Sequence, residues 1–193
     1  MELKKYLKIR TLPEGWSKWK VSDKAKTASG ATPLTSNALF YENGDIPWIN
    51  SGELSESEIV TAQNFISKAG FENSATKMFP VNTVLIAMYG ATVGKTSLLK
   101  LKACTNQAIC AIIPNKSYYS PFLKYYFESL STYLISLSSG SARDNISQET
   151  IKNHIVFSPT LVYEQKRLVS IIETIDRKIA LNREINRNLP LSA

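Results

Sequence analysis

The sequence is poor in the side chains that most often carry out chemistry in enzymes. It contains two cysteines, Cys104 and Cys110, and a single histidine, His154, among 193 residues. A zinc site draws its ligands from a Cys/His cluster, which this sequence lacks. A serine-based triad would have to use that one histidine, and no Gly-x-Ser-x-Gly turn is present. The Asn-Pro-Pro-aromatic run of amino-methylating enzymes and a glycine-rich cofactor loop are also missing. We therefore expect no catalytic residue, no metal and no cofactor in this chain.

Long apolar runs are missing as well. No apolar stretch approaches the ~20 residues that are needed to cross a bilayer. The start, Met1 to Tyr6, has no apolar run after its lysines and is therefore not a signal peptide. The two cysteines lie in an apolar, strand-like segment and are expected to be small buried hydrophobic residues. Two cysteines without an export signal fit a reducing, cytoplasmic location. His154 is expected to be a structural or surface histidine.

Acidic residues are absent from one long segment. Residues 77–127 contain six lysines and no Asp or Glu, whereas residues 31–76 contain one lysine and six acidic residues. Residues 1–30 contain eight Lys or Arg and three acidic residues. A lysine-rich segment without acids is typical of a surface that faces DNA phosphates, and the alternative is a solvated face that serves solubility. The segment is also interleaved with tyrosines, which favours DNA: Tyr89, Tyr118, Tyr119, Tyr125 and Tyr126. The acidic segment should face away from DNA or towards a protein partner.

Short apolar strands dominate the first 115 residues and helical patterns follow. This order predicts an α+β fold with a mixed or antiparallel sheet. Pro47 suggests that its strand lies at a sheet edge. Leucines and aromatic residues at helical spacing predict one helix from Pro121 to Leu137. The other expected strands follow the turn at Leu12–Trp16 or lie at 84–88, 96–99, 108–113 and 155–157.

The segment from Gly90 to Thr96 resembles a phosphate-binding loop, but its spacing is wrong. Three residues separate Gly90 from Gly94, where a P-loop has four. The residues after Thr96 have no helical stripe, and a P-loop needs a helix there. Nucleotide hydrolysis is therefore the least favoured function. The alternative is a glycine-rich hairpin whose backbone amides, Lys95 and Thr92 approach DNA.

The segment from Val162 to Leu189 contains no proline or glycine and predicts a helix about 40 Å long. Its apolar residues recur in steps of three and four and form one narrow stripe: Leu168, Ile171, Ile172, Ile175, Ile179, Ile185 and Leu189. Asn182 interrupts this stripe. Such a helix either folds back on its own domain or pairs lengthwise with another helix, and the rest of the sequence favours pairing.

Several short motifs occur together in a recognisable order. They are Leu12-Pro-Glu-Gly-Trp16, Gly44-Asp-Ile-Pro-Trp-Ile-Asn-Ser-Gly-Glu53, Met88-Tyr-Gly-Ala-Thr-Val-Gly-Lys95, Thr105-Asn-Gln-Ala108, Asn145-Ile-Ser147, Pro159, Glu164-Gln-Lys-Arg167 and Ile175-Asp-Arg-Lys-Ile179. Each motif alone is weak, but the ordered set resembles the specificity (S) subunit of Type I restriction-modification systems. A full subunit of that family has two recognition domains and two long helices, and this chain has one of each. It therefore resembles a half-length form, either a natural half-subunit or one domain of a longer protein.

The resemblance implies a DNA target-recognition domain at residues 1–160 and a dimerising or spacer helix at residues 161–193. The chain would itself catalyse nothing. Its expected partners are double-stranded DNA, methyltransferase (modification) subunits, a restriction subunit and, through the C-terminal helix, a second copy paired as an antiparallel coiled coil. The alternative is a stand-alone DNA-binding regulator or an antirestriction decoy, which binds DNA without modification subunits.

Polar residues in loops that end strands are the candidates for DNA contact, because recognition residues concentrate there. Four lysines are candidates for phosphate contact: Lys20, Lys24, Lys26 and Lys95. Six residues are candidates for base readout or its support: Asn50, Ser51, Tyr89, Thr92, Arg143 and Asn145. For Ser51 and Asn145, a turn residue that serves its own backbone is an equal alternative.

Overall fold

The computed structural model describes residues 3–7, 11–138 and 145–188. Most strands precede most helices along the chain, which confirms the predicted α+β class. The helices and short 3-10 turns are α1 (Leu3–Tyr6), α2 (Val21–Lys24), η1 (Ala38–Phe40), η2 (Ser51–Ser55), α3 (Lys68–Glu72), η3 (Gly90–Thr92), α4 (Ser120–Ser129), α5 (Ser131–Ser138), α6 (Gln148–Lys152) and α7 (Val162–Asn188). The strands are β1 (Trp16–Lys20), β2 (Thr27–Ser29), β3 (Ile46–Ile49), β4 (Glu58–Ile59), β5 (Phe65–Ile66), β6 (Met78–Phe79), β7 (Val84–Ala87), β8 (Thr96–Leu99), β9 (Ala103–Thr105), β10 (Ile109–Ile112) and β11 (Ile155–Pro159).

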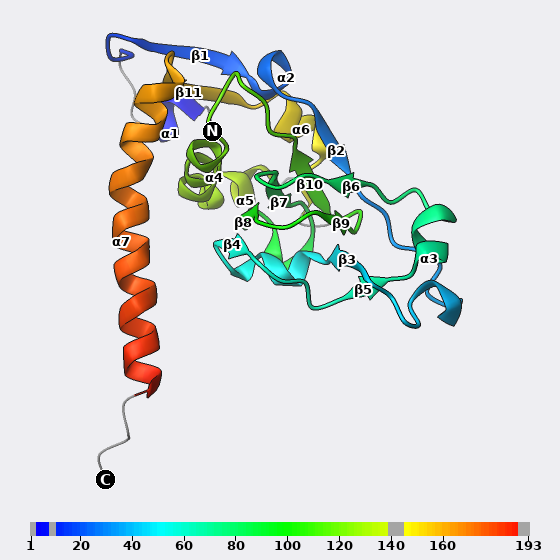
Figure 1. Ribbon diagram of the computed structural model, residues 1–193. Coiled ribbons are helices and arrows are strands. Elements are labelled where there is room, and N and C mark those ends of the chain that lie inside the picture. Colours follow the sequence, from blue (N-terminus) through cyan, green and yellow to red (C-terminus); the bar gives the residue numbers. More distant parts are fainter. Residues whose placement is uncertain (1–2, 8–10, 139–144, 189–193) are drawn as a thin grey trace.

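Three sheets build the domain (Figure 1). The central sheet has the strand order β2-β10-β7-β8-β4, and a smaller sheet has the order β5-β3-β9-β6. Antiparallel pairs predominate, but β4 pairs with β8 and β3 pairs with β9 in parallel, so the sheets are mixed. The third sheet pairs β1 with β11 antiparallel, which joins the start of the chain to the segment just before α7.

The core lies on both faces of the central sheet. Strand β7 is buried along its whole length, with Val84 and Ile86 on one face and Leu85 and Ala87 on the other. The first face packs against α4 and α5 through Leu123 and other apolar residues. The second face packs against the smaller sheet. A strand with two buried faces is an apolar run without alternation, which is how residues 84–88 appear in the sequence.

The free cysteines confirm the sequence prediction for them. Cys104 in β9 and Cys110 in β10 are both fully buried and unpaired. Burial raises the pKa of the Cys104 thiol to about 11 and that of Cys110 to about 12. Both are therefore neutral thiols at neutral pH, and neither is a nucleophile.

Two expectations about individual elements were wrong. The helix predicted from Pro121 to Leu137 is divided in two, because Leu130 leaves the helical backbone path between α4 and α5. The residues around the break, Ser129, Ser131 and Thr132, favour bonds to nearby backbone groups, and the Ser129 hydroxyl donates to the Tyr126 carbonyl at 2.7 Å.

The second wrong expectation concerns the strand that contains Pro47. It was expected at a sheet edge, but β3 lies inside its sheet, between β5 and β9. Trp48 N–H donates to the Asn64 carbonyl on the β5 side at 2.9 Å, so the nitrogen of Pro47 points towards β9. Pairing with β9 begins only at Trp48. The missing N–H of Pro47 therefore costs no ladder hydrogen bond.

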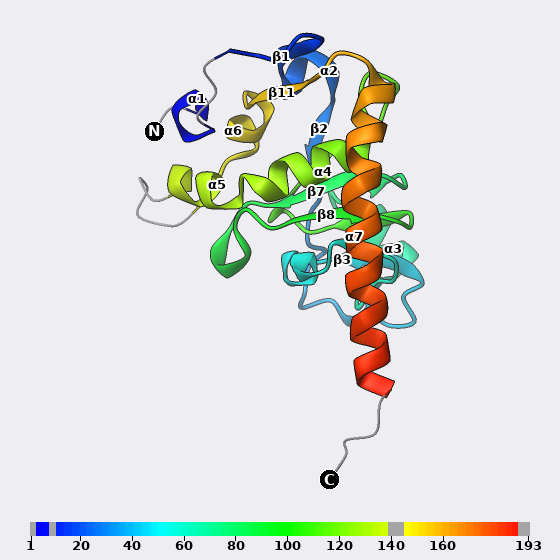
Figure 2. The ribbon, with the colours of Figure 1, turned by 90° about the vertical axis from the view of Figure 1, so that its left-hand side faces the viewer.

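Helix α7 stands along one side of the domain and extends past it (Figure 2). It contains 27 residues and begins at Val162, in close agreement with the predicted helix. Within the described ranges, no helix is long and apolar enough to span a membrane.

Candidate nucleic-acid interface

Four of the predicted site residues come together at one end of the central sheet, where β7 ends and β8 begins. Tyr89 pairs with Asn145 in an isolated antiparallel bridge, although the two residues are far apart in the sequence. Beside them, Ile146 N–H donates to the Met88 carbonyl and Met88 N–H donates to the Ala108 carbonyl, both at 2.8 Å. The bridge and these bonds together hold three segments side by side: the one that follows β7, the one that precedes β10 and the one that precedes α6.

The turn between β7 and β8 places Thr92 and Lys95 next to Tyr89. Gly90 and Gly94 adopt positive φ angles of 67° and 79°, which the tight turn requires. The Thr92 hydroxyl donates to the Tyr89 carbonyl at 3.4 Å, and Lys95 N–H donates to the Thr92 carbonyl at 3.0 Å. Lys95 is exposed, and Tyr89 is 39% exposed. Strand β8 follows the turn directly, so the segment is a hairpin and not a P-loop.

Sequence reasoning missed a second polar pair, Thr32 and Gln107. The Thr32 hydroxyl donates to Gln107 Oε1 at 2.7 Å, and the Gln107 side chain is exposed. Gly30 lets this loop approach β9, because a Cβ at Gly30 would lie 1.8 Å from the Thr105 carbonyl oxygen. The local signal for this pair is the Thr105-Asn-Gln motif, which also contributes to the family resemblance.

Asn50 and Ser51 begin η2, which packs against η3. Asn50 Oδ1 accepts a hydrogen bond from Gly52 N–H at 2.9 Å, and Asn50 N–H donates to Glu53 Oε1 at 3.0 Å. The Asn50 side chain therefore serves its own turn, which leaves it fewer free groups for a base edge. Ser51 is partly exposed.

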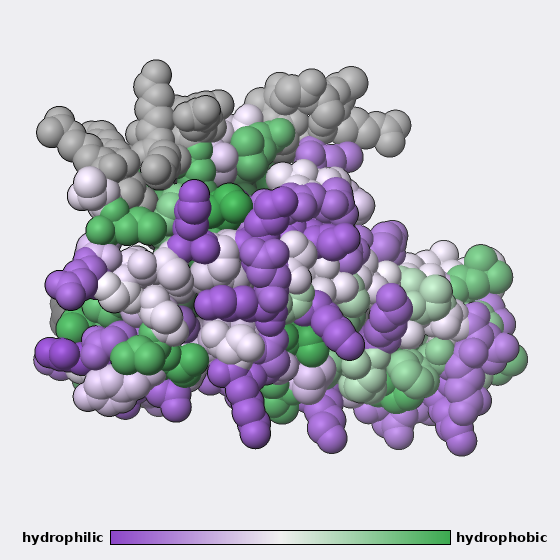
Figure 3. Space-filling model, turned by 90° about the horizontal axis from the view of Figure 1, so that it is seen from above, coloured by the Kyte–Doolittle hydropathy of each residue, from purple (hydrophilic) through white to green (hydrophobic). Residues whose placement is uncertain are grey.

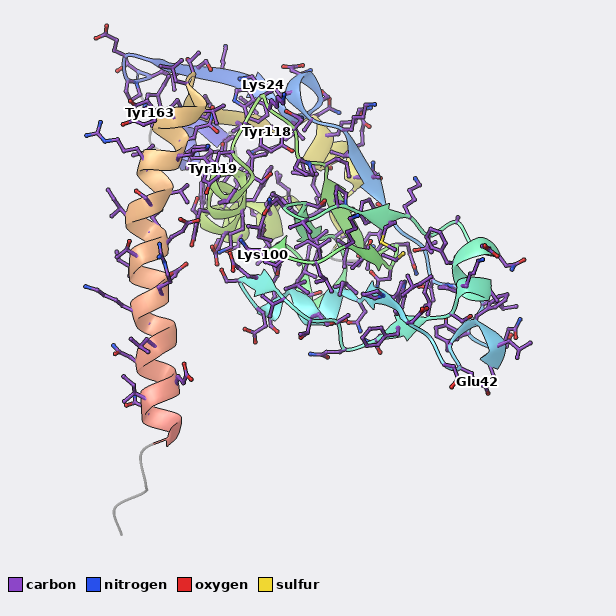
Figure 4. The ribbon with its side chains drawn as sticks, in the orientation of Figure 1. Lys24, Glu42, Lys100, Tyr118, Tyr119 and Tyr163 are labelled. Atoms are coloured by element: carbon purple, nitrogen blue, oxygen red, sulfur yellow. The ribbon has the colours of Figure 1, made fainter. Side chains whose placement is uncertain are left out.

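The three N-terminal lysines lie elsewhere, around α2 at the top of the domain (Figure 4). Lys24 is half-buried, with its ammonium 4.8 Å from the centroid of the Trp19 ring. Trp19 in turn stacks on Tyr118 at 6.1 Å between ring centroids. Lys20 and Lys26 are exposed. Seen from above, hydrophilic residues are gathered across the middle of the molecule (Figure 3).

The acid-free segment does not form the single DNA-facing surface that its composition suggested. Tyr118 is 3% exposed and its hydroxyl donates to the Ile113 carbonyl, and the Tyr126 hydroxyl donates to the Ile155 carbonyl. Lys124 is 2% exposed and bonds Glu128 and Ser57. Lys100 pairs with Glu58 at 3.0 Å. Tyr118 and Lys124 are therefore used inside the domain, because buried polar groups need partners there, whereas Tyr126 is half-buried and the Lys100–Glu58 pair is partly exposed.

Helix α7 presents a second candidate surface. Its predicted stripe is uncovered over the described residues: Leu168, Ile171, Ile172, Ile175, Ile179 and Ile185 are between 40% and 63% exposed. Val169 and Gln165 are instead buried against the domain. The stripe is thus largely exposed, although Ile179 also lines a cleft between α7 and the domain.

Two predicted site residues, Arg143 and Leu189, lie outside the described residues. Over the residues that are described, no three His, Cys, Asp or Glu side chains come close enough to hold a metal ion. The exposed loops offer amides, hydroxyls and lysine ammonium groups, a set that suits hydrogen bonds to bases and charge contacts to phosphates.

Residues 13–191 match the family described as the Type I restriction modification DNA specificity domain. The specificity subunit of the Type I restriction enzyme EcoR124I/EcoR124II of Escherichia coli is 25% identical over 190 residues, covering 94% of this chain and 46% of that protein. The MjaIX specificity subunit of Methanocaldococcus jannaschii is 28% identical over 186 residues, covering 94% and 42%.

The HsdS subunit structure from Thermoanaerobacter tengcongensis superposes with a TM-score of 0.68 at 21% identity, covering 91% of this chain and 40% of that one. At this identity the superposition shows a shared fold. The chain spans less than half the length of each of these relatives.

Proposed function

Because the chain belongs to the family of Type I restriction-modification DNA specificity domains, we propose that it reads one half-site of double-stranded DNA. In this proposal the chain catalyses nothing and directs methylation by modification subunits and cleavage by a restriction subunit. The family match over residues 13–191 is the observation that carries the proposal. Residues 1–160 form the recognition domain in this proposal, and residues 161–193 form the spacer.

The polar end of the central sheet supports the recognition role. Tyr89, Thr92 and Asn145 lie in loops that are tied to the sheet by backbone hydrogen bonds. A rigid loop binds DNA with little loss of conformational entropy, which favours specific contacts. Lys95 is the best-placed of the predicted phosphate contacts, because it is exposed beside these residues. The proposed contact set also retains Lys20, Lys26 and Ser51.

The uncovered stripe of α7 supports a homodimer. Six large apolar side chains exposed along one helix are unfavourable in water and are buried when two such helices pair. We propose that two chains pair antiparallel through α7, with Ile175 near the two-fold axis. Two identical domains related by this axis read the same half-site twice, in inverted orientation, with an unread gap between.

The test is a methylome of cells that express the modification subunits with and without this chain. The proposal expects methylation at an interrupted palindrome that disappears when the chain is removed. An asymmetric bipartite motif, in the absence of a second specificity protein, excludes the homodimer.

A pull-down separates this function from the alternative of a stand-alone regulator or antirestriction decoy. A methyltransferase (modification) subunit should co-purify with the tagged chain. A chain that binds DNA tightly but retains no such subunit contradicts the proposed function and favours the alternative.

A further inference from the structure

A buried glutamine fixes the first turns of α7 to the domain. The Gln165 side chain is fully buried. Its Oε1 accepts a hydrogen bond from Tyr119 N–H, and its Nε2 donates to the Pro159 carbonyl, both at 2.9 Å. Tyr119 precedes α4 and Pro159 ends β11, so one side chain joins the helix to two separate segments. A tilt of α7 would break one of these bonds in a buried site, where an unpaired polar group is costly.

A second bond holds α7 eleven residues further along, which is about 16 Å. The Tyr125 hydroxyl donates to Asp176 Oδ2 at 2.6 Å. This hydrogen bond lies at the border of a cleft of about 660 Å³ between α7 and the domain, which is lined by Glu56, Glu58 and Glu173 among others. Because the cleft removes packing contacts there, the hydrogen bond contributes much of the restraint on the helix at this level. Burial, followed by the bond to Asp176, raises the pKa of Tyr125 above its usual value, so the hydroxyl remains a donor.

The angle between α7 and its domain matters because the helix is a lever. A domain of about 160 residues has a radius of gyration of about 15 Å, so its centre lies roughly that far from α7. A rotation of the domain by about 12° at its attachment to α7 therefore moves this centre by about 3 Å along the helix axis, the direction in which the two domains are separated. This displacement is close to the ~3.4 Å between successive base pairs in DNA. A loss of angular restraint is thus large enough to change the gap between two half-sites by one base pair.

We propose that Gln165, Tyr125 and Asp176 act as positioning residues. Their hydrogen bonds hold the angle between α7 and the domain and thereby set the length of the unread gap. They determine this part of the specificity without touching DNA. The inference rests on the proposed homodimer, since the gap exists only when two domains are joined.

Three substitutions test the inference, and two more serve as a rescue variant and a control. Tyr125→Phe removes one hydroxyl at the domain surface, and Asp176→Ala removes its acceptor. Asp176→Asn keeps an oxygen acceptor and should restore the wild-type behaviour. Gln165→Met removes both hydrogen bonds at nearly constant volume. Tyr163→Phe is the matched control, because Tyr163 lies on the same helix and is 69% exposed.

The main experiment records methylation in cells by each variant together with the modification subunits. Wild type, Asp176→Asn and Tyr163→Phe should show one gap length. Tyr125→Phe and Asp176→Ala should raise methylation at sites with a gap one base pair longer or shorter by about fivefold, the factor expected for one lost hydrogen bond. The half-site sequences should not change. A single, unchanged gap in folded Tyr125→Phe overturns the inference, whatever the behaviour of Gln165→Met.

A second measurement separates this inference from the proposed function. Spin labels at Lys68→Cys and Lys178→Cys, in labelled chain diluted into an excess of unlabelled chain, report the distance from domain to helix in one protomer. Tyr125→Phe should broaden the distance distribution, and Tyr163→Phe should not. An unchanged distribution in Tyr125→Phe overturns the positioning role. A broadened distribution without an interrupted palindrome in the wild-type methylome contradicts the homodimer and the gap-setting role, but leaves the mechanical restraint.

Discussion

At the scale of single residues, some of the predicted DNA contacts already have partners within the domain, and others remain exposed to solvent. Lys24 sits over the Trp19 ring, and the Asn50 carboxamide caps its own turn. Both have less to offer to DNA than their sequence context suggested. Lys95 and Tyr89 remain exposed at the polar end of the central sheet. We therefore rank Lys95 above Lys24 as a phosphate contact.

Lys95→Ala should weaken DNA binding by the assembled complex for all sequences alike, because a phosphate contact carries no base information. The slope of log K against log salt should fall by about one. Lys24→Ala should change the slope less, and Lys68→Ala controls for net charge, since Lys68 is distant in sequence and pairs with Glu72. Fluorescence anisotropy over a salt series measures all three. Unchanged affinity and slope in Lys95→Ala would remove it from the interface.

His154 makes the stability of the domain depend on pH. Its ring is 6% exposed among Tyr126, Phe127 and Tyr133, and its Nε2 has no hydrogen-bond partner. Burial lowers the pKa of His154 from 6.5 to about 4. The folded state therefore prefers the neutral ring, and the stability from this group is present above the unfolded pKa and lost as pH falls through 6.5 towards 4.

We expect the free energy of unfolding to fall by about 2 kcal/mol from this residue between about pH 7.5 and about pH 5. His154→Leu should remove most of that pH dependence, although packing changes will alter its stability at neutral pH. Urea unfolding at several pH values measures both. Equal slopes against pH in the two proteins would show that His154 does not titrate on unfolding.

At the scale of elements, α7 is the helix whose two sides have different tasks. Gln165 and Val169 are buried against the domain, whereas the stripe residues from Leu168 to Ile185 are largely exposed, with Ile179 at the border of the cleft next to the domain. A single helix of this kind gains little stability beyond its contact with the domain, because isolated helices are marginal in water. The exposed stripe is therefore the part of the molecule that most requires a partner.

Ile175→Asp should convert the proposed dimer to a monomer, because it places a charge without a partner in an apolar contact at a cost of several kcal/mol. Ser170→Asp is the control, since it adds the same charge on an exposed part of the helix away from Ile175. Light scattering at micromolar concentration, without DNA or other subunits, gives the mass. A monomeric wild type would contradict the homodimer.

At the scale of the whole molecule, the proposed function depends on distance as much as on contact. In the proposed function, the domain reads a short sequence, and α7 sets the distance between the two half-sites. The two tasks are carried by different segments, so they should respond to mutation independently.

Inserting seven residues, about two turns, into α7 directly after Asp176, so that the insertion spans the two-fold axis, should move the two domains apart by about 10 Å in an antiparallel pair. The unread gap should grow by about three base pairs while both half-sites keep their sequence, because the recognition domain is unchanged. Methylome sequencing measures gap and half-sites together. A changed half-site with an unchanged gap would show that α7 is not the spacer.

Much of the architecture could be predicted from local sequence patterns. The apolar runs at 84–88 and 96–99 are strands β7 and β8, the spacing after Val162 is helix α7, and both cysteines are buried. These features depend on neighbouring residues along the chain, since hydrophobic periodicity and the positions of proline and glycine are local properties. The ordered motifs identified the family on the same basis.

The tertiary structure decided which polar residues are free. The sequence placed Tyr118, Tyr126 and Lys124 in a DNA-facing segment, but Tyr118 and Lys124 are buried, Tyr126 is half-buried, and each bonds a group outside α4. The bridge between Tyr89 and Asn145, and the bonds from Gln165 to Tyr119 and Pro159, join residues that no local pattern connects. A side chain's burial and hydrogen-bond partners depend on segments distant in the chain, so composition alone cannot place it on a surface.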